Sequence, residues 1–60
     1  MSSCILEATN LLVEVEGIGV DLKQPRESIL IDLIKRILDL PGDNDAILNC
    51  LLYEVGNEKN

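Results

Sequence analysis

The clearest amphipathic pattern in the chain lies in the sequence SILIDLIKRILDL, residues 28–40. At the roughly 100° per residue of an α-helix, its apolar side chains fall within about 200° of arc and its polar side chains fill the remainder. Pro25 suits the first turn of a helix, where a missing N–H costs no hydrogen bond, and Pro41-Gly42 ends the segment. The pattern predicts a helix over residues 25–40. Its apolar residues are Ile29, Leu30, Ile31, Leu33, Ile34, Ile37, Leu38 and Leu40.

A second amphipathic segment, AILNCLLYEV, follows after a short link. Asp43 or Asn44 can cap the start of a helix here, and Gly56 is a suitable C-terminal stop. We predict a helix over residues 44–55 and a frayed polar tail over residues 57–60. Because the link is short, the two helices are expected to fold back on each other. One apolar stripe runs along this helix and consists of Ile47, Leu48, Leu51, Leu52 and Val55.

The N-terminal third of the chain allows two interpretations. On a helix, the apolar residues of this segment share about 120° of arc, and Ser3 can cap the first turn. The alternative is a β-hairpin over residues 11–22, because VEVE alternates with period two and valine favours strands. The helix over residues 3–16 explains a longer window and is preferred. The residues that share the arc are Cys4, Ile5, Ala8, Leu11, Leu12 and Val15.

Gly17 would then close this helix in the left-handed conformation, as glycine does at many helix ends. In that arrangement Ile18 is expected to pack back on the last turn. With Val20 and Leu22 it would form an extended apolar linker that lies on the core.

These elements predict an all-α fold, a single three-helix domain over residues 1–60. The alternative is an N-terminal hairpin followed by two helices. Hydrophobic residues make up 47% of the chain, almost all of them aliphatic, which is more than a core of this size needs. We therefore expect self-association, most simply as a homodimer, through the helix over residues 25–40. The expected interface residues are Leu30, Ile31, Ile34 and Leu38.

The two cysteines, Cys4 and Cys50, lie far apart in the sequence and do not form a ligand pair for zinc. We interpret both as small buried hydrophobic residues, the usual state of free cysteine, and a disulfide between them as possible but unsupported. The chain has no histidine and no nucleophile with an evident base beside it. We expect no metal, no cofactor and no enzymatic activity.

Charge is distributed unevenly. The chain has eleven acidic and five basic residues, for a net charge of −6. Every charged side chain before Lys23 is acidic, and we expect these acids to steer a charged partner: Glu7, Glu14, Glu16 and Asp21. An acidic chain repels phosphate, so we expect no binding to nucleic acid or to an anionic membrane. The lack of a signal sequence or membrane span favours the cytoplasm.

Two functions remain compatible with these observations. The first is a small acidic interaction module that self-associates through its apolar helix and binds a larger protein. The second is an acidic inhibitor, of the antitoxin, immunity or anti-defence type, that covers a basic site on its target.

Overall fold

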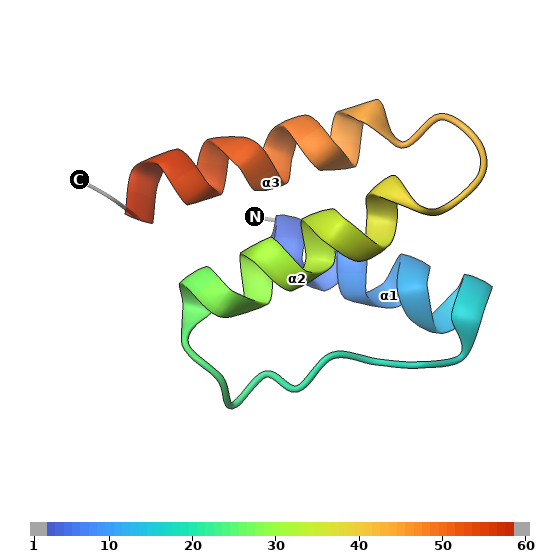
Figure 1. Cartoon of the computed structure of the whole chain (residues 1–60), viewed down its shortest axis with the longest axis horizontal. Coiled ribbons are helices and arrows are strands. Elements are labelled where there is room, and N and C mark those ends of the chain that lie inside the picture. Colours follow the sequence, from blue (N-terminus) through green and yellow to red (C-terminus); the bar gives the residue numbers. More distant parts are fainter. Residues whose placement is uncertain (1–2, 59–60) are drawn as a thin grey trace.

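The computed structural model describes residues 3–58 and consists of three helices joined by two connections (Figure 1). They are α1 (Cys4–Glu16), α2 (Arg26–Leu38) and α3 (Asp45–Glu58). Within residues 3–58 there is no strand, so the all-α prediction is confirmed and the hairpin alternative over residues 11–22 is wrong. In the part of the chain that is described, no helix has the length and apolar character needed to cross a membrane.

The second and third helices form an antiparallel hairpin, and α1 packs against both of them (Figure 1). The core lies where the three helices meet. Leu30 and Leu33 of α2, Leu12 of α1 and Leu51 of α3 have no exposed surface. Leu30 was expected at an interface between chains, but it faces the inside of its own chain and is unavailable to a partner. The buried core comprises Cys4, Ala8, Leu12, Ile29, Leu30, Leu33, Ile37 and Leu51.

The first helix ends at Gly17, as the sequence predicts. Gly17 adopts φ 73° and ψ 8°, and its N–H donates to the carbonyl of Val13 over 2.9 Å. This is a left-handed helix end, which glycine adopts without steric cost. Beyond it, only Val20 packs against the core, while Ile18 and Leu22 are exposed. The expectation that Ile18 packs back on the helix is wrong, because 63% of its surface is exposed.

The ends of the other helices differ from the predicted bounds by one to three residues. Pro25 is the N-cap of α2 rather than its first residue, and Asp39 follows the last residue of that helix. At the start of α3 the Asp43 side chain accepts a hydrogen bond from the N–H of Asp45, over 3.1 Å.

Gly56 lies inside α3 and does not stop it. Its φ is not positive, and a lone glycine costs a helix only about 1 kcal/mol. Asn57 and Glu58 therefore belong to the helix rather than to a tail. Residues 59–60, the rest of the predicted tail, lie outside the described residues.

Candidate functional site

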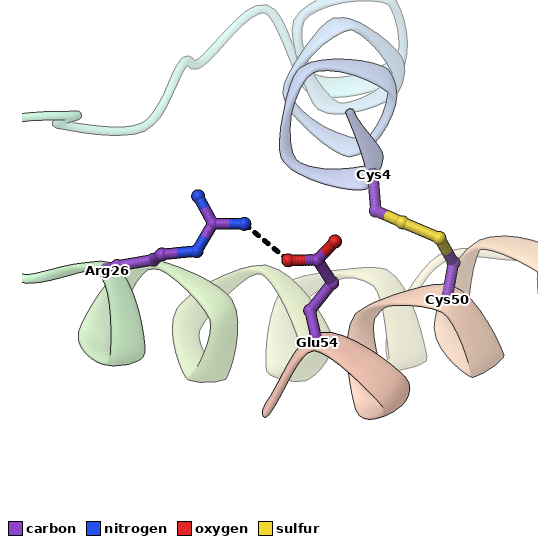
Figure 2. The surroundings of a disulfide bond; sticks show 4 residues. All are labelled: Cys4, Arg26, Cys50 and Glu54. Carbon is purple, nitrogen blue, oxygen red and sulfur yellow. Dashed lines mark hydrogen bonds and ion pairs between the residues drawn. A yellow bond between two sulfur atoms is a disulfide. The ribbon is translucent and has the colours of Figure 1, made fainter. Parts of the chain in front are cut away.

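A disulfide joins the first residue of α1 to the middle of α3 (Figure 2). It links Cys4 to Cys50, whose Cα atoms lie 6.0 Å apart, across 46 positions of sequence. Cys4 is buried, with 6% of its surface exposed, whereas Cys50 is exposed. The interpretation of both residues as free, buried thiols is therefore wrong. Cys50 lies beside the apolar stripe of α3, on the side that faces α1, and the helical pattern of α3 gives no sign of the distant partner.

An ion pair lies one helical turn from Cys50 (Figure 2). Glu54 of α3 accepts a hydrogen bond from the guanidinium of Arg26 at the start of α2. The two side chains are 29% and 49% exposed, so this pair adds little to the free energy of unfolding. It does place a carboxylate and a guanidinium beside the exposed half of the disulfide.

Arg36 of α2 holds the linker after α1. Its guanidinium donates to the carbonyl oxygens of Ile18 and Gly19 over 3.0 and 3.1 Å, and to the carboxylate of Glu16 over 3.2 Å. The planar guanidinium can satisfy several acceptors at once, which an ammonium group does less well. This contact could not be predicted from the sequence, because the three acceptors lie 17 to 20 positions from Arg36.

The four acids expected to steer a partner have different roles. Glu16 pairs with Arg36, and the carboxylate of Asp21 accepts from the N–H of Lys23 over 2.9 Å. Both therefore contribute to the structure of the linker. Glu7 and Glu14 are exposed, and their spacing of seven residues places them on one side of α1. Only these two acids form a common acidic face on a helix.

Exposed apolar side chains gather on the hairpin of α2 and α3. Ile31 and Leu38 are 41% and 64% exposed, and Leu52 is 55% exposed. Ile34 lies between the first two on the same face of α2, and Leu48 precedes Leu52 by one turn of α3; both are half-buried and also pack against the core. We name these five residues the hairpin strip: Ile31, Ile34, Leu38, Leu48 and Leu52. The sequence predicted the α2 residues of this surface but not its α3 residues.

The hairpin strip faces away from α1. Cys50 marks the side of α3 that faces α1, and Leu52, two residues further, is rotated from it by about 200°. Arg36 marks the side of α2 that faces the end of α1, and Leu38 is rotated from it by the same angle. Both halves of the strip therefore lie on the side of the hairpin that α1 leaves uncovered.

Two opposite charges flank Ile31 of the hairpin strip at equal distances along α2. Glu27 precedes Ile31 by four residues, and Lys35 follows it by four. Both side chains are exposed, and within the described residues neither forms an ion pair. This arrangement is self-complementary, because an antiparallel copy of α2 centred on Ile31 would place each Glu27 opposite a Lys35.

A second apolar surface lies on the outer face of α1. Leu6 and Val13 are 57% and 48% exposed and are seven residues apart, so they share one face of the helix. Glu7 and Glu14 follow them directly in the sequence and flank this face on one side. The outer face of α1, defined by these four residues, is therefore apolar with an acidic edge.

Within residues 3–58 the structure encloses no pocket and brings together no group of three or more potential metal ligands. Comparison of the chain with models of known protein families, with curated proteins and with solved structures found no match. The candidate site therefore rests on this chain's own surfaces: the hairpin strip, the outer face of α1 and the disulfide.

Proposed function

We propose that this chain is a small acidic protein–protein interaction module that forms a homodimer through the hairpin strip and binds a larger protein through the outer face of α1. The observation that carries the proposal is the strip itself, in which aliphatic side chains stay exposed on the one side of the hairpin that α1 does not cover. Exposed apolar patches of this kind mark interaction sites on small proteins. The proposed function is non-catalytic.

The size of the chain supports self-association. A 60-residue domain buries only about 60% of the surface that its unfolded chain exposes, and its stability is correspondingly marginal. A second copy would cover Ile31, Leu38 and Leu52 and add buried area that the isolated chain lacks. Aliphatic side chains contribute about 25 cal/mol for each Å² removed from water. Net charge opposes the dimer, since each copy carries −6, so the apolar contact must provide the attraction.

A pair of matched substitutions tests the dimer. Leu52→Asp places a charge in the hairpin strip, and Leu6→Asp places the same charge on the outer face of α1, at a site of nearly equal exposure, 57% against 55%. Sedimentation equilibrium should show a dimer at low micromolar concentration for the unchanged protein and for Leu6→Asp, and a monomer for Leu52→Asp. A monomeric unchanged protein, or equal weakening by both substitutions, would contradict the proposal.

The acidic edge of the outer face supports an alternative in which the chain is an inhibitor of the antitoxin, immunity or anti-defence type. In that case Glu7 and Glu14 would steer the chain to a basic site, and association would slow as salt rises. Glu7→Gln with Glu14→Gln should abolish capture of a basic protein from the source cell. Asp32→Asn with Asp39→Asn removes the same charge from α2 and its C-cap and should leave capture intact. Equal capture by both double variants would count against this alternative.

The expected location is the cytoplasm, and this remains a proposal. Disulfides are rare there, and those that form are commonly transient and respond to redox conditions.

A further inference from the structure

The two sulfur atoms of the disulfide have unequal surroundings. Cys50 lies in the middle of α3 and is exposed, whereas Cys4 is 6% exposed and is part of the buried core. A thiolate must approach one sulfur from solvent in order to exchange with a disulfide. Access therefore favours attack at Cys50.

The two cysteines also differ as leaving groups. Cys4 is the first residue of α1, where the unpaired N–H groups and the helix dipole stabilise a negative charge. Thiolates at helix N-termini are stabilised in this way and leave more readily from a disulfide. The apolar core around Cys4 opposes this stabilisation, so the exposure of Cys50 is what decides the direction of reaction.

We infer that the Cys4–Cys50 bond is a site of thiol–disulfide exchange, attacked at Cys50 and released at Cys4, with a thiol or dithiol of low molecular weight or a dithiol protein as the co-reactant. The inference is independent of the proposed function, because it uses neither the hairpin strip nor the outer face of α1.

The reaction balances with a dithiol as the reductant. Its first thiolate forms a bond to the Cys50 Sγ while the bond between Cys50 and Cys4 breaks, and Cys4 leaves as a thiolate that takes up a proton. The second thiolate of the dithiol then attacks its own partner sulfur, which releases Cys50 as a thiolate. Two electrons pass from the dithiol to the protein, and the dithiol becomes a disulfide.

The structural consequence is confined to one helix end. The bond holds the N-terminus of α1 to the middle of α3 (Figure 2). The Arg36 contact lies at the opposite end of α1. Exchange would free the N-terminus of α1 from α3, while Arg36 continues to hold the linker at the other end.

The charges beside Cys50 provide a local probe of the attacked atom. Glu54 follows Cys50 by one turn, and Figure 2 shows both side chains on the side of α3 that faces α1. Side chains at this spacing lie about 5–6 Å apart at Cβ, so the carboxylate repels an anionic thiolate that approaches Cys50. Glu54→Gln removes this repulsion and leaves Arg26 with its positive charge.

The direct test uses the oxidised full chain and glutathione, a monothiol that stops at the mixed disulfide. After a short incubation in native buffer, free thiols are blocked with iodoacetamide and the peptides are read by mass spectrometry. Glutathione should be found on Cys50 and carbamidomethyl on Cys4, in at least about tenfold excess over the reverse pattern. In concentrated urea the fold no longer distinguishes the two sulfurs, and the excess should fall to about twofold or less.

Two further variants complete the test. Glu54→Gln should accelerate adduct formation about threefold, and Glu14→Gln, which removes the same charge three turns along α1 from Cys4, should not change the rate. Comparable adducts on both cysteines in native buffer, an excess on Cys4, or exchange only in urea would overturn the inference. Equal effects of the two substitutions would also overturn it, because attack would then not pass beside Cys50.

Discussion

At the scale of single residues, Gly17 and Gly56 illustrate how backbone conformation decides the effect of a substitution. Neither glycine has an atom within 4 Å of where a Cβ would lie, so steric space does not distinguish them. Gly17 has φ +73°, a region that costs an L-residue roughly 1 kcal/mol or more, whereas Gly56 lies inside α3 without a positive φ.

We therefore predict opposite outcomes for the same substitution. Gly17→Ala should lower the free energy of unfolding by about 1 kcal/mol, and Gly56→Ala should raise it by about 0.5–1 kcal/mol because alanine favours a helix interior. Urea denaturation followed by circular dichroism measures both. If Gly17→Ala leaves the free energy of unfolding unchanged, the end of α1 does not require a left-handed residue. Destabilisation by Gly56→Ala would contradict the prediction for the interior of α3.

Neighbouring residues of α2 show what the sequence can and cannot predict at this scale. The pattern correctly assigned a wide apolar arc to the helix, but an arc of about 200° does not reveal which part faces its own chain. Leu30 is fully buried and Ile31 is 41% exposed, although both lie in the arc. Only the packing of α1 and α3 against α2 buries Leu30 and leaves Ile31 exposed. This packing depends on all three helices together.

At the scale of elements, local patterns predicted three helices and the left-handed end at Gly17. They did not predict how the elements are tied together. The Arg36 contacts and the disulfide join positions that are 17 to 46 residues apart, and no helical period relates such positions. Capping and periodicity act within a turn or two of helix, so contacts between elements lie beyond their range.

The disulfide is the strongest of these ties, and its loss gives a prediction for α1. Closing a loop of this length lowers the entropy of the unfolded chain by an amount worth about 4 kcal/mol. A chain of 60 residues has a total free energy of unfolding of only about 3–9 kcal/mol. Reduction should therefore shift the midpoint of urea unfolding strongly downward. Hydrogen exchange should accelerate first in α1, near Cys4.

A variant without the bond is the control for this prediction. Cys4→Ala with Cys50→Ala should match the reduced protein within about 1 kcal/mol, and dithiothreitol should not affect it. An unchanged midpoint on reduction of the natural chain would show that packing alone holds α1 on the hairpin.

At the scale of the whole molecule, Ile31 of the hairpin strip and the two charges that flank it make a specific prediction about how two copies meet. If two α2 helices pack antiparallel about Ile31, each Glu27 lies opposite a Lys35 of the second copy. The dimer then contains two such pairs, related by the two-fold axis. Glu27→Lys or Lys35→Glu alone would remove two attractions and add two repulsions, each worth about 0.5 kcal/mol, for a total of about 2 kcal/mol. Each single variant should therefore weaken the dimer by about tenfold or more.

The double variant, Glu27→Lys with Lys35→Glu, restores two attractive pairs with reversed polarity and should regain most of the lost affinity. The helix dipole, which acts within each copy, predicts instead that the double variant does not recover its helix content. Each substitution places the wrong charge at its end of α2, so the double variant should be the least helical of the three. Sedimentation equilibrium measures the affinity, and circular dichroism on the same samples measures the helix content. Recovery of the dimer without recovery of helix content would assign the effect to contacts between copies. A double variant weaker than either single variant would exclude the antiparallel arrangement about Ile31.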